Sequence, residues 1–427
     1  MNSFGKAVAA AAMILLASSC NAFLFDIPNP GQDGNRYSDA LIYIAVGYNN
    51  LSGSISGNIN TVLSSSLPSE SSGKALVICS HLTKDNGTRY DIPTPAHIVK
   101  ISSGWDGQPI CDTLYTTKDD IMLTNPSDLR SVLEIIKERV VSDHYFLIYS
   151  SHGTGWLPEN YYDSPQPGSG GILSSAPAGI PHQLVPGPSD GLFTKSIGCE
   201  GRNENGRLVS HETELTAFKS AIPEGMHFDF IFFDACLMGG IETAYELKEI
   251  TDGIGFSQTE ILSAGFDYRP LTRRLLAEKN PEGLCDDYYR YYEAQSGTHK
   301  SATISYIDCR ELEGLATVCR ELFEKYRNRI AALTETSVQG YYRNGKHWFF
   351  DLEDILVQSG IDAGERDRLS AALSACVKYK AATEKFMLAF EIKKHCGLSS
   401  YLPGMGDANL DAAYRKLAWN KATLLIK

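Results

Sequence analysis

The sequence predicts an α/β fold built around a mostly parallel sheet. Short continuous apolar runs, the pattern of strands buried on both faces, alternate along the chain with segments of helical periodicity. The composition agrees with a folded chain, because 43% of the 427 residues are hydrophobic and 21% are charged. This length fits two or three domains or one elaborated domain, and the composition excludes collagen-like, coiled-coil and wholly disordered chains.

Strand-like and helix-like segments follow one another in the order expected of such a sheet. The strand-like runs are 40–46, 75–79, 145–149, 228–233, 303–307 and 398–402. The segments with helical periodicity are 61–67, 128–140, 212–222, 239–250, 310–333, 365–378 and 383–394. Residues 157–207 are dense in Pro, Gly and Ser and predict a long loop, and loops of this length are usually functional or disordered.

The N-terminal residues 1–19 are typical of a secretory signal peptide. Lys6 is their single charge, an apolar run covers 7–17, and small residues precede Cys20. The apolar run is too short to span a bilayer. The cysteine resembles that of a bacterial lipobox, although Ala17 stands where such motifs usually carry Leu. We expect an exported protein that is lipidated on this cysteine and anchored at the bacterial cell envelope, with simple secretion as the alternative.

Beyond the signal, the sequence predicts a tether and two structural units. Residues 20–37, rich in Asn, Pro and Gly, form the tether. The main α/β domain covers 38–300 and contains the long loop, and a helix-rich subdomain covers 301–427. No later run reaches the ~18 apolar residues of a membrane helix, so we expect membrane attachment through a lipid anchor alone.

Charge and cysteine content argue against several classes of partner and cofactor. The chain has 39 Lys and Arg against 51 Asp and Glu, a net charge of −12, and therefore lacks the basic excess that binds nucleic acid. Its ten cysteines are scattered and do not form a disulfide scaffold, and of the nine that remain when Cys20 is set aside at least one is unpaired. We expect no metal and no other cofactor, since neither zinc-site spacing nor an EF-hand loop occurs.

Two of the strand-like runs end in residues that carry chemistry. The run 145–149 leads into His152, and the run 228–233 leads into Cys236. Ligands in open α/β sheets bind outside the carboxyl ends of the strands, so two such ends can meet in one crevice. The two side chains can therefore form a dyad.

The residue types around Cys236 fit nucleophilic catalysis. A helix is expected to begin near Gly239, and a helix N-terminus favours the thiolate. His152 could protonate a leaving amine, and the amide of Gly153 could stabilise an oxyanion. Taken singly, the cysteine is more often a buried structural thiol, and a histidine after a strand more often caps a turn.

Together these motifs closely resemble the clostripain-like cysteine peptidases of clan CD, in particular their Bacteroides-type lipoprotein members. The resemblance rests on His152-Gly153, Asp234-Ala235-Cys236-Leu237-Met238-Gly239, Glu242, Ser257-Gln258-Thr259-Glu260 and Gly397-Leu398-Ser399-Ser400-Tyr401-Leu402-Pro403. It spans nearly the whole mature chain. It implies a caspase-like α/β sandwich and a cysteine endopeptidase that cleaves peptide bonds after Arg or Lys through a thioester acyl-enzyme.

The resemblance also implies residue roles. Cys236 is the nucleophile, His152 is the general acid/base without an essential third member, and the amides of Gly153 and Cys236 form the oxyanion hole. Asp234 matches the acidic residue of the specificity pocket, with Glu260 and Asp267 as secondary candidates. The alternative for Asp234 is a strand-end carboxylate that accepts turn amides.

The interval between the two dyad residues is longer than in compact family members, and the excess is the Pro- and Gly-rich loop. Relatives mature by cleavage between the His and the Cys, so Lys195, Arg202 and Arg207 are candidate processing sites of a zymogen. The alternative is a loop that shields the cleft or shapes substrate choice in a fully active single chain.

We expect a monomer that acts on protein or peptide substrates. The main rival is a non-catalytic binding or adhesion lipoprotein on the same fold, with its dyad blocked or misaligned. Thiol redox exchange is disfavoured because no resolving cysteine lies near Cys236. Ser150 and Ser151 lack a G-x-S-x-G elbow, glycines 168–171 follow no strand, and the tyrosines of 288–292 predict helix packing rather than a sugar platform.

Overall fold

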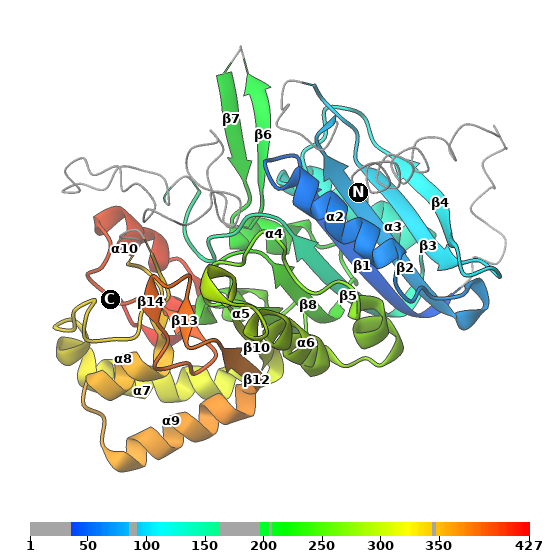
Figure 1. The fold of residues 1–427 in the computed structure, drawn as a ribbon. Helices are drawn as coiled ribbons and strands as arrows, with labels where there is room; N and C mark the ends of the chain where they lie inside the picture. Colours follow the sequence, from blue (N-terminus) through cyan, green and yellow to red (C-terminus); the bar gives the residue numbers. More distant parts are fainter. Residues whose placement is uncertain (1–35, 85–91, 160, 162–196, 205–206, 344–346) are drawn as a thin grey trace.

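The computed structural model describes residues 36–427 except 85–91, 160, 162–196, 205–206 and 344–346. Its centre is a nine-stranded sheet with helices on both faces (Figure 1). The predicted α/β fold with helices flanking a central sheet is confirmed. The predicted signal peptide and Cys20 lie outside the described residues.

The sheet has a parallel centre and antiparallel flanks. In spatial order its strands are β12 (Val377–Ala382), β10 (Thr303–Asp308), β9 (Gly253–Phe256), β8 (Phe228–Asp234), β5 (Ser142–Ser150), β1 (Tyr37–Gly47), β2 (Lys74–Leu82), β3 (His97–Ser103) and β4 (Pro109–Thr116). The strands from β9 to β2 run parallel to one another, whereas β10 and β12 on one side and β3 and β4 on the other join antiparallel.

The helices and the smaller sheets follow the same chain order. The helices are α2 (Ser52–Leu63), α3 (Pro126–Arg139), α4 (Leu215–Ala221), α5 (Ile241–Leu247), α6 (Pro281–Glu293), α7 (Leu312–Ile330), α8 (Leu352–Gln358), α9 (Ala363–Cys376), α10 (Ala408–Tyr414) and α11 (Ala418–Thr423). Three two-stranded sheets pair β6 (Cys199–Glu204) with β7 (Arg207–Glu212), β11 (Phe350–Asp351) with β15 (Ser399–Ser400), and β13 (Lys385–Phe386) with β14 (Phe390–Glu391).

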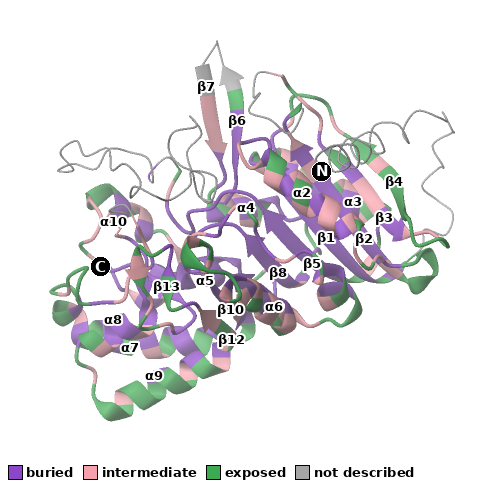
Figure 2. Ribbon diagram, in the orientation of Figure 1, coloured by how far each residue is buried: buried purple, intermediate pink, exposed green. Residues whose placement is uncertain are grey.

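The central strands are buried on both faces, which explains their continuous apolar runs. In β1, Ile42 and Ile44 belong to the core on one face of the sheet, with residues of α3, α4, α5 and α7, whereas Leu41 and Tyr43 belong to the core on the opposite face, with residues of α2 and α6. Successive side chains of a strand point to opposite faces, so a strand covered on both sides must be apolar at every position. Figure 2 shows the result as a band of buried strands through the middle of the molecule.

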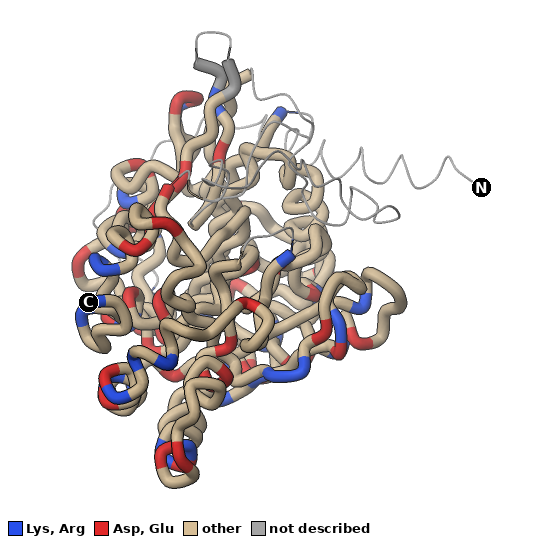
Figure 3. The backbone as a smooth tube through the Cα atoms, turned by 90° about the vertical axis from the view of Figure 1, so that its left-hand side faces the viewer, with Lys and Arg blue, Asp and Glu red and all other residues tan. Residues whose placement is uncertain are grey.

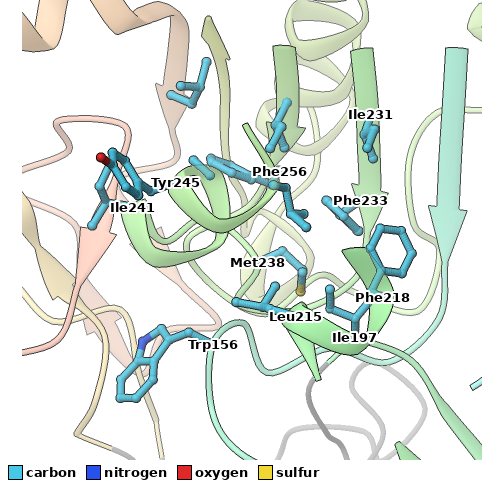
Figure 4. Packing of buried hydrophobic residues seen from close by; sticks show 14 of the residues in the cluster. Trp156, Ile197, Leu215, Phe218, Ile231, Phe233, Met238, Ile241, Tyr245 and Phe256 are labelled. Carbon is cyan, nitrogen blue, oxygen red and sulfur yellow. The ribbon is translucent and has the colours of Figure 1, made fainter. Parts of the chain in front are cut away.

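Buried aromatic side chains fix the helices to the sheet beside the strand ends. The rings of Phe218 on α4 and Phe233 on β8 lie 5.9 Å apart, and Phe218 meets Tyr149 of β5 edge to face at 5.3 Å. Figure 4 shows Phe218 and Phe233 side by side, with Met238 and Leu215 close by. The ends of β5 and β8 are therefore rigidly held.

Helix α2 differs from its predicted position. The sequence predicts a helix over 61–67, and the structure places it at Ser52–Leu63. Serine, glycine and asparagine dominate this segment and have low helix propensity, which conceals the helix. Ile55, Ile59 and Val62 are nevertheless buried at helical spacing, so packing on the sheet outweighs propensity.

The predicted loop 157–207 ends in regular structure. Cys199–Glu204 forms β6 and pairs with β7 in a hairpin that projects from the body of the molecule (Figure 1). The helix predicted over 212–222 accordingly begins at Leu215. A polar hairpin is held by main-chain hydrogen bonds and has little apolar pattern to reveal it. Residues 162–196 of the predicted loop lie outside the described part of the chain.

The C-terminal region departs from the prediction in two ways. The helix predicted over 383–394 is absent, and the β13–β14 hairpin occupies this segment. Met387 and Leu388 have φ of 48° and 57°, a left-handed conformation that no α-helix accommodates. In addition, β10 and β12 extend the central sheet, although both fall inside the predicted subdomain 301–427. The helix-rich part is thus continuous with the sheet.

Several general features of the described residues bear on function. None of the nine described cysteines forms a disulfide with another, and all but Cys111 are buried. No helix among these residues is long and apolar enough to cross a membrane. No group of three or more His, Cys, Asp or Glu side chains in the same described region is arranged as a metal site. Figure 3 shows basic and acidic positions interspersed over the visible side.

Candidate active site

The site is built where two neighbouring parallel strands end. Ser150 at the end of β5 pairs with Asp234 at the end of β8, and the amide of Ser151 donates a 3.3 Å hydrogen bond to the carbonyl of Asp234. His152 and Cys236 each lie two residues beyond the last pair. The strand register therefore brings together the two side chains that the sequence singled out.

His152, Cys236 and Asp234 line one small cavity. Its other walls come from α2 and from the segment Ile261–Gly265. The cavity volume is ≈ 30 Å³, which is far less than a lysine or arginine side chain needs. A lysine or arginine side chain enters this cavity only if its walls move.

Cys236 carries a neutral thiol in this arrangement. Its Sγ accepts a 3.3 Å hydrogen bond from the amide of Ile261 and donates over 3.7 Å to the carbonyl of the same residue. Burial raises the pKa of the thiol to about 12, and the charge of Glu260 adds to the effect. This shift favours the thiol, in the opposite sense to the thiolate predicted from a helix N-terminus. The helix α5 begins only at Ile241, and its dipole is felt only near its first turn.

His152 is a neutral imidazole with one free nitrogen. Its Nε2 is hydrogen-bonded to Oδ1 of Asn50 at 2.7 Å. Its Nδ1 is buried and has no hydrogen-bond partner among the described residues. Burial lowers the pKa of the imidazole to about 4. Asn50 was not among the residues predicted from sequence.

Gly153 lies against the backbone of the nucleophile candidate. A Cβ at this position would stand 2.6 Å from the carbonyl oxygen of Cys236 and 3.2 Å from its nitrogen. Any larger residue would push the two strand ends apart. The glycine thus allows the backbone of residue 153 to lie close to that of Cys236.

Asp234 is a buried carboxyl at the base of the cavity. Its Oδ2 accepts hydrogen bonds from the hydroxyl of Tyr268 at 2.6 Å and from that of Ser150 at 3.2 Å. Burial raises the pKa of this carboxyl to about 6, against the opposing effect of these hydrogen bonds and one from the amide of Phe266. A Cβ at Gly265 would stand 2.5 Å from the carboxylate, so only glycine leaves it room.

The two secondary pocket candidates are engaged elsewhere. Glu260 forms a part-buried ion pair with Arg343, in which Nη2 lies 3.0 Å from Oε1 and Nε contacts Oε2. Asp267 pairs with Arg269 at 2.7 Å in a separate surface groove. The described lining of the cavity beside Cys236 includes neither carboxylate.

The candidate processing residues occupy different settings. Arg202 is an exposed side chain within β6, opposite Val209, and Arg207 is the first residue of β7. Lys195 lies outside the described residues, directly before the segment that begins at Ile197. A peptide bond inside a paired strand is less accessible to a peptidase than one in an unpaired segment.

Glu242 and Trp156 tie the C-terminal region to the site. Glu242 on α5 accepts hydrogen bonds from the Ser400 hydroxyl (2.8 Å), the Tyr401 amide (3.0 Å) and the Tyr414 hydroxyl (2.6 Å). Trp156, four residues beyond His152, packs edge to face on both tyrosine rings at 5.2 and 4.9 Å. The C-terminal residues therefore support the segments that follow β5 and β8.

Gln258 adds a second buried link. Its amide nitrogen donates to the Ser305 hydroxyl (2.8 Å) and the Gly397 carbonyl (2.9 Å), and its Oε1 contacts Nε2 of His395 at 2.8 Å. Both Gln258 and Glu242 belong to the motifs on which the resemblance rests. In this structure they position the backbone rather than line the cavity.

Comparison with known proteins agrees with this geometry. A family model described as the Clostripain family matches residues 193–388. A search against curated protein sequences returns no match. Among solved structures, the chain resembles a secreted C11 cysteine protease from Bacteroides thetaiotaomicron, "iotapain", with a TM-score of 0.70 and 21% identity over 91% of this chain and 99% of that one.

Two further solved structures share the fold. An inactive zymogen C11 protease from Parabacteroides distasonis has a TM-score of 0.69 and 24% identity over 93% of this chain and 99% of that one. A Bacteroides thetaiotaomicron C11 protease in complex with an irreversible peptide inhibitor has a TM-score of 0.70 and 19% identity over 91% and 99%. The chain therefore resembles the Clostripain family over residues 193–388 and shares the fold of these C11 cysteine proteases.

Proposed function

We propose that the chain is an endopeptidase that hydrolyses peptide bonds after Arg or Lys, with Cys236 as nucleophile and His152 as general acid/base. The observation that carries this proposal is the convergence of both side chains with the buried carboxyl of Asp234 at the ends of β5 and β8. A nucleophile, a base and an acidic pocket residue in one cavity are the parts that this reaction needs.

The reaction follows from the groups at the site. The Cys236 thiol gives its proton to His152, and Sγ attacks the carbonyl carbon of the scissile bond. The amides of Gly153 and Cys236 stabilise the resulting oxyanion. His152 then protonates the leaving amine, the C–N bond breaks, and a thioester remains. Water, deprotonated by His152, attacks the thioester, which releases the acid and restores the thiol.

Asp234 sets the preference for a basic side chain. A carboxylate in a largely desolvated pocket is best stabilised by a cationic partner, and a neutral side chain would leave it unpaired. The peptide inhibitor bound by one of the structural relatives supports a peptide as the substrate. Because Glu260 and Asp267 are paired with arginines, they contribute to the pocket only if these pairs open.

The small volume of the cavity supports an inactive precursor that matures by cleavage. A volume of ≈ 30 Å³ holds no basic side chain, and burial keeps both dyad residues neutral. One structural relative is described as an inactive zymogen and another as secreted, which supports maturation of an exported protein. Of the three candidates, Lys195 is favoured as the cleaved residue because Arg202 and Arg207 belong to a paired hairpin.

The test is covalent labelling by short peptides that carry Lys or Arg before a thiol-reactive group. The expected result is one adduct on Cys236 by mass spectrometry, absent in Cys236→Ala and strongly reduced in His152→Ala. Peptidase activity of both variants should fall comparably, since residues that act as a unit give non-additive losses. A Cys236→Ala protein that keeps a tenth of the activity would contradict the proposal. Absence of any adduct, before and after proteolytic nicking, would indicate a binding module.

A further inference from the structure

We infer that Asn50 is a positioning residue that holds His152 in one tautomer, with the proton on Nε2 and the free base at Nδ1. This inference rests on the proposed function. An amide oxygen accepts but cannot donate, so the 2.7 Å contact between Oδ1 of Asn50 and Nε2 requires a hydrogen on that nitrogen. The nitrogen left to exchange a proton with a thiol is the buried, unpartnered Nδ1.

Asn50 is held in place by its neighbour in the chain. The side chain of Asn49 donates to the carbonyls of Val46 at 3.0 Å and Cys199 at 2.7 Å, and it accepts from the amide of Leu51 at 2.8 Å. Asn49 is buried, and its partners Val46 and Cys199 lie in β1 and β6. Its third partner, Leu51, directly precedes α2, which begins at Ser52, while β1 ends at Gly47. The short connection therefore has little freedom to move Asn50 away from the imidazole.

The backbone of His152 is fixed to the same group of residues. The Ser151 hydroxyl donates to the Val46 carbonyl at 2.9 Å and accepts from the Cys199 amide at 3.2 Å. The amide of Gly198 donates to the carbonyl of His152 at 3.0 Å. The segments that carry Asn50 and His152 thus bond to the same two residues, Val46 and Cys199. This shared attachment holds the donor and the acceptor in a precise orientation.

A neutral orienting group suits this site. An imidazole that must take a proton from a thiol needs one lone pair aimed at the sulfur, and a hydrogen bond from its other nitrogen fixes which lone pair that is. A carboxylate in place of the Asn50 amide would also stabilise the imidazolium and raise the pKa of His152. Asparagine fixes the orientation without this charge.

The test combines nuclear magnetic resonance of histidine side chains with kinetics. The full chain is labelled with ¹⁵N in histidine, and His152 is assigned by comparison with His152→Ala. At neutral pH, we expect the shifts of a neutral imidazole with hydrogen on Nε2. In Asn50→Ala, the population should move toward a mixture of tautomers. A wild-type imidazole protonated on Nδ1 would overturn the inference.

The kinetic arm uses the cleaved or otherwise active enzyme. Asn50→Ala should lower kcat by roughly 10- to 100-fold, a part of the ~10²–10⁴ that a positioned base contributes, with little change in KM. Asn50→Asp should retain more activity and move the pH profile, because its carboxylate raises the pKa of His152. Asn60→Ala, on the outer part of α2, is the matched control and should behave as wild type.

The outcomes separate this inference from the proposed function. If Asn50→Ala keeps full kcat while Cys236→Ala is inactive, the peptidase assignment stands and the role of Asn50 is wrong. If no variant including wild type is active, the proposed function fails, and the tautomer measurement still decides the role of Asn50 toward His152. A loss of kcat in Asn50→Ala with an unchanged tautomer would show that the residue is merely structural.

Discussion

The hydroxyl of Tyr268 donates a 2.6 Å hydrogen bond to Oδ2 of Asp234, the carboxyl at the base of the cavity. This bond favours the ionised carboxylate, whereas burial favours the protonated form, and burial prevails because the pKa is raised to about 6. The ionisation that prepares the cavity for a basic side chain therefore falls near pH 6.

Activity on Lys and Arg substrates should depend on this ionisation. We expect kcat/KM of the active enzyme to rise with pH through an apparent pKa near 6, because a protonated Asp234 cannot pair with a cation. Asp234→Asn should remove most activity toward basic substrates. In Tyr268→Phe the opposing hydrogen bond is lost, so the rising limb should move to higher pH. A pH profile unchanged in Tyr268→Phe would contradict this account.

The same carboxyl should affect stability in the opposite sense. Its pKa is raised above the unfolded value of about 3.8, so its stabilising contribution is complete below that value and is lost as pH rises through about 6. Asp234→Asn resembles the protonated form and should therefore be more stable than wild type at pH 8, by at most about 3 kcal/mol. Urea unfolding at pH 8 and pH 4 measures this, and the gain should shrink at the lower pH.

The Glu260–Arg343 pair should tune the thiol of Cys236. The charge of Glu260 raises the pKa of the thiol and that of Arg343 lowers it, both less than burial does. Glu260→Gln should therefore speed alkylation of Cys236 by iodoacetamide at pH 8, and Arg343→Gln should slow it. Alkylation is followed by mass spectrometry of the peptide that contains Cys236. Equal rates in the two variants would show that the pair does not act on the sulfur.

Incubation of the purified chain should test maturation. Wild type should be cleaved into two fragments after Lys195, Arg202 or Arg207. The Cys236→Ala chain should stay intact. Lys195→Gln should slow the conversion most, because the other two sites lie in the β6–β7 hairpin. Denaturing gels and N-terminal sequencing identify the cut. An intact wild-type chain that hydrolyses arginyl substrates at full rate would exclude obligatory processing, and identical fragments in Cys236→Ala would indicate a foreign protease.

Glu242 should be a strong determinant of stability. Its carboxylate accepts three hydrogen bonds from Ser400, Tyr401 and Tyr414, so Glu242→Ala leaves three buried donors without a partner and should cost roughly 3 kcal/mol or more. Glu242→Gln keeps an acceptor oxygen and should cost less. Glu324→Ala, at an exposed position on α7, is the control and should change unfolding by less than about 0.5 kcal/mol. Urea unfolding in the Cys236→Ala background avoids self-cleavage.

The central strands could be predicted because burial on both faces leaves a plain signal. β1, β5 and β8 each contain an unbroken apolar run, and the helices α3 and α7 have clear apolar periodicity. Of the strands in the central sheet, β3, β4, β9 and β12 escaped prediction. β4 is exposed along nearly all its length and β9 has four residues, so neither carries a pattern that burial would impose.

The candidate site could be predicted in part for the same reason. His152, Asp234 and Cys236 follow apolar runs, and the rule that ligands bind beyond strand ends singles them out. Asn50 follows the end of β1 in the same way, so this rule could also have pointed to it, but asparagine after a strand is common in turns and is not distinctive. The small volume of the cavity and the arginine partners of Glu260 and Asp267 depend on tertiary packing, which no local sequence pattern encodes.

Because Ser150 pairs with Asp234, the distance between His152 and Cys236 does not depend on the number of residues between β5 and β8. Both strand ends are set by the sheet, and Gly198 and Cys199 bond to the segment that carries His152, so residues can be added to or removed from the interval 162–196 without moving the side chains of His152 and Cys236. Loop length affects closure entropy only logarithmically, at about 0.6 kcal/mol per doubling. The interval between the two strands is thus a natural place for variation between relatives, and for insertion of a reporter sequence whose release would record the enzyme's own activity.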